Sequence, residues 1–159
     1  MVKGEKVKKT FSEDNKGIFM NSTLVSRVAK NKTEEIRISV LKNNKIDLRI
    51  YFNFPNEPEP KPTKKGLWLS FKYMPKVITA LEKLIKNPKE ALDVELDTTE
   101  KEQIKIYNLE YNGKMFTHIR SFYQKDGAFA PGKGVSFSEN AFPALLEGLK
   151  KACELNGKV

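Results

Sequence analysis

Two chemically versatile side chains are almost missing from this sequence of 159 residues, which holds one cysteine, Cys153, and one histidine, His118. A lone cysteine excludes an internal disulfide framework and is typical of a reducing compartment. There is no cluster of cysteines and no HExxH-type spacing, so nothing in the sequence supports a metal site. Cys153 falls on the apolar face of the last predicted helix, where a buried structural thiol is expected. We therefore expect no catalytic residue, no metal, no cofactor and no enzymatic activity.

Long apolar runs are also missing. No segment approaches the roughly 20 residues that a membrane-spanning helix needs, and the N-terminal MVKGEKVKKTF lacks the apolar segment of a signal peptide. We therefore expect a protein that is neither membrane-bound nor secreted and that works inside the cell, in the cytoplasm, nucleoid or nucleus. Apolar residues make up 39% of the chain, which is enough for a globular core.

Positive charge prevails over negative charge. The chain has 29 Lys+Arg against 20 Asp+Glu, a formal net charge of +9. A surplus of this size favours a polyanionic partner, nucleic acid before membrane. Residues 1–16 are polar and lysine-rich without periodicity, and we interpret them as a flexible basic arm.

A repeated unit organises the remaining chain. In residues 17–88, apolar and polar residues alternate in successive segments, which predicts four β-strands. One amphipathic helix follows them and ends at Asn87-Pro88. The predicted strands include Leu24–Val28, Ile36–Val40, Ile46–Phe52 and Leu67–Leu69, and the helix face comprises Met74, Val77, Ile78, Leu81, Leu84 and Ile85.

The same unit begins again in residues 89–155. Phe142 follows Met74 by 68 residues, and Pro143 follows Pro75 at the same offset. The sequence therefore predicts an α+β fold made of two ββββα repeats. One such unit is thin and leaves a face that needs a partner. We expect the two repeats to form one intertwined, pseudo-two-fold domain with curved antiparallel sheets and packed helices.

The second repeat contains the strand with the clearest binding pattern. It opens at Asn112-Gly113, the dipeptide that favours a type I′ hairpin turn. Alternate residues of a strand share a face, and one face here carries Phe116, His118, Arg120 and Phe122. Interleaved aromatic and basic groups favour unpaired bases, which stack on rings while cations meet phosphate. The alternative is an ordinary half-buried strand whose aromatic residues close a core.

The same alternation supplies further candidate nucleic-acid-binding residues. Some of the aromatic residues among them are expected to close one sheet against the other copy instead. The sheet faces contribute Arg37, Arg49 and Tyr51 in the first copy and Lys105 and Tyr107 in the second, and the turns add Lys42, Lys45 and Lys114.

These motifs point to a family. The segment YNGKMFTHIRSFY, followed by PGKGVSFS and an amphipathic helix, resembles the single-strand-binding domain of the positive cofactor four family of transcriptional coactivators. The first copy carries related motifs in IDLRIYF and KPTKKGLWL, so the resemblance spans nearly all of the chain beyond the arm. It implies a sheet-lined groove for single-stranded or melted DNA. In that family the unit homodimerises, whereas Whirly and Pur-type proteins carry two units in one chain, an arrangement closer to this sequence.

The resemblance also implies roles for individual positions. Carried over by motif, binding residues fall on Tyr111, Lys114, Arg120 and Tyr123 in the second copy and on Arg49 and Phe52 in the first. The glycine-containing motifs add Lys64, Lys65 and Lys133 to the predicted set. Alternation and motif disagree at one point, because alternation places Phe122 on the open face and the motif points to Tyr123.

The sequence departs from the family pattern at three places. The first hairpin is shortened and has no aromatic residue at its tip, Pro131–Gly134 is one residue short of the usual spacing, and His118 replaces an acid. The two copies are therefore expected to contribute unequally, and the second is the stronger candidate for base stacking.

The leading functional hypothesis is a single-stranded DNA-binding protein without sequence specificity, acting in replication, recombination or transcription. Two alternatives stay open. One is an RNA-binding protein, and the other is an adaptor that contacts transcription machinery through its basic arm and proline-rich loop, residues 55–62. The expected partners are single-stranded DNA, RNA or melted duplex, and the intramolecular pseudo-dimer leaves further homo-oligomerisation open.

Overall fold

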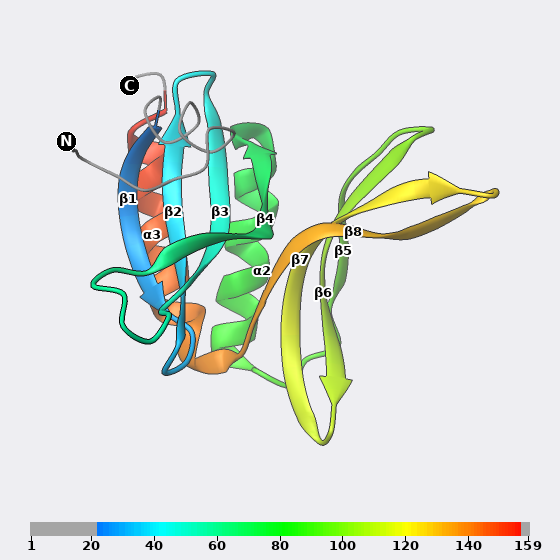
Figure 1. The fold of residues 1–159 in the computed structure, drawn as a ribbon. Coiled ribbons are helices and arrows are strands. Elements are labelled where there is room, and N and C mark those ends of the chain that lie inside the picture. The colour runs from blue at the N-terminus through cyan, green and yellow to red at the C-terminus, as the bar shows by residue number, and fades with distance from the viewer. Residues whose placement is uncertain (1–21, 157–159) are drawn as a thin grey trace.

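The computed structural model describes residues 22–156 and places them in two four-stranded antiparallel sheets, each followed by a helix (Figure 1). The strand orders are β1-β2-β3-β4 in the first sheet and β5-β6-β7-β8 in the second. The predicted α+β class and its two ββββα units are thereby confirmed. The predicted basic arm, residues 1–16, lies outside the described residues.

Two pairs of corresponding elements in the two units share one offset along the chain. Strands β2 and β6 begin at residues 34 and 102, and helices α2 and α3 begin at 74 and 142, a shift of 68 in both cases. The first unit comprises β1 (Ser22–Ala29), β2 (Glu34–Leu41), β3 (Lys45–Phe52), β4 (Lys61–Ser70) and α2 (Met74–Lys86). The second comprises β5 (Asp93–Thr98), β6 (Glu102–Tyr111), β7 (Lys114–Lys125), β8 (Ala128–Phe137) and α3 (Phe142–Glu154).

Both units contribute to one apolar core. Ile38 and Leu48 of the first sheet and Ile106 and Ile119 of the second are fully buried. Because alternate residues of a strand point to opposite sides, the polar residues between them lie on the outer face of each sheet. Helix α2 lies in the middle of this core, in contact with α3 and with β5.

Helix α3 of the second unit packs against β1 and β2 of the first sheet, beside α2 (Figure 1). Gly148 makes the close approach possible. A Cβ atom at this position would lie 2.6 Å from Cδ1 of Ile38 and 2.9 Å from Cβ of Ser26. The sequence of the second unit is therefore matched to a surface of the first, and the two helices together cover the inner face of the first sheet.

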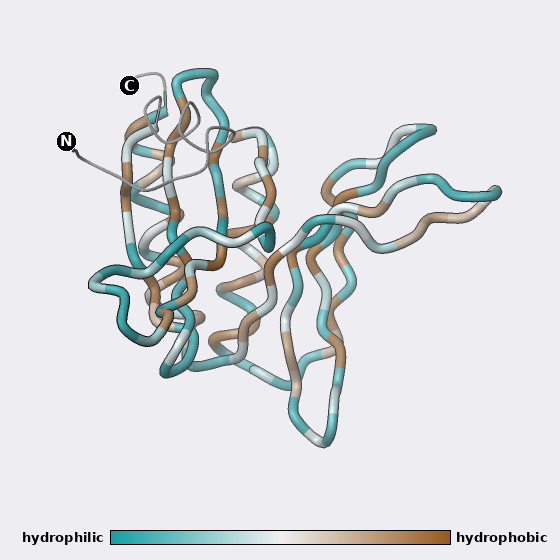
Figure 2. Tube along the Cα trace, viewed as in Figure 1, coloured by the Kyte–Doolittle hydropathy of each residue, from teal (hydrophilic) through white to brown (hydrophobic). Residues whose placement is uncertain are grey.

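The second sheet lies beside the first, where β8 runs next to β4 (Figure 1). Its hairpins project from the body of the molecule, and their tips are largely hydrophilic, whereas hydrophobic residues concentrate along the helices and the inner sides of the sheets (Figure 2). None of the helices within residues 22–156 is long and apolar enough to cross a membrane.

The contact of α3 with the first sheet can be tested by filling the space at Gly148. Overpacking the filled contact at Gly148 with leucine costs up to about 3 kcal/mol, because the helix is forced outward. Leucine's better helix propensity returns about 1 kcal/mol, so we expect Gly148→Leu to lower the free energy of unfolding by about 2 kcal/mol. Urea denaturation followed by circular dichroism measures the change. The matched control is Glu147→Leu at the exposed neighbouring position, expected within about 0.5 kcal/mol of wild type. An unchanged midpoint for Gly148→Leu would contradict the packing.

Candidate nucleic-acid interface

The outer face of β6 and β7 forms a continuous row of aromatic and basic side chains, which we call the platform. The two strands pair without a bulge from Glu102↔Tyr123 to Tyr111↔Lys114. Pairs on the outer face are therefore every second one along the ladder. The platform consists of Lys105, Tyr107, Tyr111, Lys114, Phe116, His118, Arg120 and Phe122.

Ring contacts order the middle of the platform. Tyr107 on β6 stacks on His118 on β7, with centroids 5.0 Å apart and planes 7° from parallel. Phe122 lies 5.8 Å from the same tyrosine ring. At the hairpin end, Nζ of Lys114 lies 5.5 Å from the ring centre of Phe116. The platform thus alternates flat rings with cations, as a surface for stacked bases and phosphates requires.

Arg120 is the central cation of the platform. Its Nη1 donates a hydrogen bond of 2.9 Å to the carbonyl oxygen of Gly132, and its Nη2 lies 3.4 Å from Nδ1 of His118. Within residues 22–156 it forms no ion pair. Lys105, its cross-strand neighbour, pairs with Asp93 at 2.6 Å. Arg120 therefore keeps donor capacity for an anion, since a guanidinium has five N–H donors.

Glycine on β8 makes room for this arginine. Gly134 pairs with Arg120, and a Cβ atom at Gly134 would lie 2.7 Å from the carbonyl oxygen of Ile119 and 2.8 Å from Cβ of Arg120. The first sheet repeats this arrangement with Gly66 opposite Arg49. The glycine of both motifs is thus explained by close packing beside the central arginine.

The matching face of the first sheet has different electrostatics. Arg49, the counterpart of Arg120, forms a salt bridge of 3.0 Å with Asp47 and donates to the carbonyl oxygen of Thr63 at 3.0 Å. Arg37, the counterpart of Lys105, forms a salt bridge of 2.7 Å with Glu35. The charges of both predicted binding arginines are therefore already compensated.

The second unit lacks counterparts of the two acids, Glu35 and Asp47, that pair with these arginines. The ladder pairs Glu35 with Tyr51 on the first sheet and Gln103 with Phe122 at the corresponding place on the second. By the same correspondence His118 replaces Asp47. Two carboxylates of the first face are thus exchanged for neutral or basic side chains, and Arg120 is left without an ion pair within residues 22–156.

Burial strengthens the difference between the faces. Asp47 is only 2% exposed, and desolvation raises the pKa of its carboxyl group against the opposing charge of Arg49. Tyr51 is 4% exposed, with the guanidinium carbon of Arg37 4.2 Å from its ring centre. Tyr51 is accordingly a packed residue, in contact with Arg37 of its own unit.

The remaining predicted residues lie elsewhere. Alternation gives the correct orientation at the point of disagreement, because Phe122 lies on the platform and Tyr123 on the opposite face, where it is 47% exposed. Phe52 lies on the inner side of β3, the side of Leu48 and Ile50. It contacts Phe54, with ring centroids 4.7 Å apart. The lysines are all exposed: Lys42 and Lys45 at the β2–β3 turn, Lys64 and Lys65 in β4, and Lys133 in β8.

Sequence reasoning missed two exposed apolar side chains. Leu109 extends the platform toward the hairpin tip and is 51% exposed. Trp68 on β4 is 40% exposed, whereas Leu67 and Leu69 on either side of it are buried. The signal for Trp68 was present, since strand alternation sends it to the opposite side from its neighbours.

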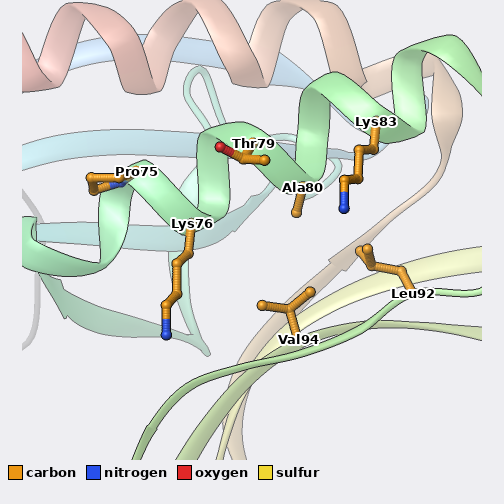
Figure 3. Close-up of a pocket in the computed structure, with 7 residues that line it drawn as sticks. All are labelled: Pro75, Lys76, Thr79, Ala80, Lys83, Leu92 and Val94. Carbon is orange, nitrogen blue, oxygen red and sulfur yellow. The ribbon is translucent and has the colours of Figure 1, made fainter.

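A cavity of about 330 Å³ between α2 and β5 offers little chemistry (Figure 3). Ala80, Leu92 and Val94 give it an apolar wall, and Lys76 and Lys83 lie at its rim. The ammonium group of Lys76 donates to the carbonyl oxygen of Glu95 at 3.4 Å. Across the described part of the chain no group of three or more His, Cys, Asp or Glu side chains could hold a metal ion.

Comparison with known families bears on the second unit. Residues 97–148 match the model of the Transcriptional Coactivator p15 (PC4) family. The resemblance to the positive cofactor four family is confirmed. All residues of the platform fall inside the matched segment. The two ββββα units of the fold fit a tandem duplication of that family's unit. No curated protein sequence matches the chain.

The pKa of His118 reports the electrostatic environment of the platform. Burial lowers the pKa of His118 below its ordinary value of 6.5, and the charges of Arg120 and Lys30 lower it further. We expect Arg120→Gln to raise the pKa of His118 by removing one of these charges. Because the chain has one histidine, an NMR titration of the imidazole protons reports this site alone. Lys114→Gln, at the hairpin end of the platform, is the control and should leave the pKa unchanged. A wild-type pKa above 6.5 would refute the assignment.

Proposed function

We propose that this chain is a non-enzymatic protein that binds single-stranded DNA with little sequence preference. The observation that best supports the proposal is Arg120, which lies beside the stacked rings of Tyr107 and His118 and forms no ion pair within residues 22–156. A guanidinium without an ion pair, next to aromatic rings, suits a phosphate and its adjacent base.

Unpaired bases fit this surface better than a duplex does. Bases in a duplex are already stacked on one another, whereas each base of a single strand gains about 1–3 kcal/mol when it stacks on an aromatic ring. Every base has a π-face, so stacking discriminates little between sequences. The formal net charge of +9 adds long-range attraction for any nucleic acid.

Transcription is the setting that the family match supports, since the matched family is one of transcriptional coactivators. We extend the proposal to an intracellular protein that acts on DNA exposed during transcription, replication or recombination. Single-stranded RNA presents the same base faces and phosphates, so RNA is the competing ligand.

Within the proposal, the second unit provides most of the binding. A phosphate that approached Arg37 or Arg49 would have to compete with Glu35 or Asp47 for the guanidinium. Asp47 is buried, and breaking a buried ion pair by removing one partner costs about 3–5 kcal/mol. The first face is therefore a poor site for anions, although it has more arginines.

Fluorescence anisotropy with labelled oligo-dT tests the proposal. We expect binding at low salt, with a plot of log K against log salt that falls by about 0.7 for each phosphate contacted. Arg120→Gln should weaken binding at least about tenfold, because a hydrogen bond to a charged group contributes about 1.5–3 kcal/mol. It should also reduce the salt slope by about 0.7.

The matched control is Arg37→Gln, which removes an arginine that is already paired with Glu35. It should bind oligo-dT nearly as wild type does. No binding of oligo-dT at low salt would disprove the proposal, and equal losses for Arg37→Gln and Arg120→Gln would disprove the assignment of binding to the second unit. Competition with oligo-U of the same length separates the DNA and RNA alternatives.

A further inference from the structure

A groove of about 470 Å³ separates the first sheet from the second, where β3 and β4 face β6, β7 and β8. Its volume lies in the range of small-molecule binding sites. The lining residues that matter here are Lys45, Arg49, Trp68, Tyr73, Glu102 and Lys133. Both units contribute to it, so the groove exists only because the two sheets lie side by side.

Trp68 is the most unusual residue of the groove. It is the one tryptophan of the chain and is 40% exposed. Leu67 and Leu69 on either side are buried in the core, at 5% and 0% exposure, and they fix the strand that presents the indole. The ring is thus held in place while part of its surface stays open. An indole held in this way is suited to stacking, because its side chain loses little conformational entropy when a base stacks on it.

The charges around the groove favour an anion. Three of its lining residues, Lys45, Arg49 and Lys133, are cationic, and Glu102 is the one acid among those within residues 22–156. Arg49 is compensated by Asp47. Neither Lys45 nor Lys133 forms an ion pair inside that range, so both ammonium groups remain available for phosphate oxygens.

The groove lies across the edge strand β8 from the platform. Lys133 directly precedes Gly134, which pairs with Arg120 across the β7–β8 ladder. Because alternate residues of a strand face opposite sides, Lys133 points away from the face of Arg120 and Gly134, to the side that carries Ser121 of the groove. A nucleic-acid strand that leaves Arg120 and bends around β8, the edge strand of the second sheet, reaches Lys133 and then the groove.

We propose that this groove is a second binding site for single-stranded nucleic acid, in which a base stacks on Trp68 and the adjacent phosphates contact Lys45 and Lys133. The inference rests on the proposed function, because it extends the path of a strand that the platform already holds. It gives the first unit a role that its compensated arginines do not provide.

Two oligo-dT probes of different length separate the groove from the platform. One has roughly six nucleotides and the other roughly sixteen, both within the range of about 4–16 nucleotides that small single-strand-binding folds cover. The short probe occupies the platform and the long one reaches the groove. Since Trp68 is the one tryptophan, its emission, excited where tyrosines absorb little, reports directly on stacking in the groove. The long probe should quench this emission and the short one should leave it unchanged.

Variants give an independent measurement on the full chain. Trp68→Leu should weaken binding of the long probe by about tenfold, in line with the loss of one stacked base, and should leave the short probe unaffected. Lys45→Gln combined with Lys133→Gln should lower the salt slope of the long probe by about 1.4. Thermal melting checks that each variant is folded. Trp68→Phe keeps a ring and should retain most of the affinity, which separates stacking from packing.

The outcomes distinguish the two proposals. If both probes bind while Trp68 emission and the affinity of Trp68→Leu stay at wild-type values, the groove is not a binding site and the platform proposal stands. If quenching by the long probe persists in Arg120→Gln at saturation, the groove binds nucleic acid in its own right. If neither probe binds at low salt, the proposed function fails, and the groove proposal fails with it.

Discussion

The shared apolar core is the constraint on which the rest of the molecule depends. Helix α3 belongs to the second repeat by sequence but packs on β1 and β2 of the first, with Gly148 against Ile38 and Ser26. Helix α2 in turn contacts both α3 and β5. With the helices gathered on the inner sides, the outer faces of both sheets are left for polar and aromatic side chains. The position of the platform is thus a consequence of where the helices pack.

Once the outer faces are free, their acids decide what each can do. The first face keeps Glu35 and Asp47, which hold Arg37 and Arg49 in ion pairs. The second face has Gln103 and His118 at the corresponding places. An arginine in an ion pair attracts phosphate only weakly, because the charge of the carboxylate cancels most of the electric field of the guanidinium at the distance of a ligand. Two similar sheets therefore present unlike electrostatic surfaces.

Alternation and the repeat predicted most of this arrangement, because both depend on local spacing. The residues of the platform follow from period two along β6 and β7, and the same rule oriented Phe122 and Tyr123 correctly. The ion pair between Arg49 and Asp47 could also be predicted from the sequence, since one residue separates the two and they must share a face of the strand. The groove at Trp68 was not, because it depends on how the two sheets pack against each other across a long stretch of chain.

Duplication within one chain also removes a restriction that a homodimer cannot escape. Identical subunits related by a two-fold axis must present identical faces, so neither can lose its binding residues without the other. Here Arg120 and Arg49 have opposite electrostatic surroundings, and the exposed indole of Trp68 has its counterpart in Ser136 of the second unit. On the proposed path from the platform to the groove, a nucleic-acid strand would meet two chemically different halves, and a surface with unlike halves favours one orientation of the bound strand.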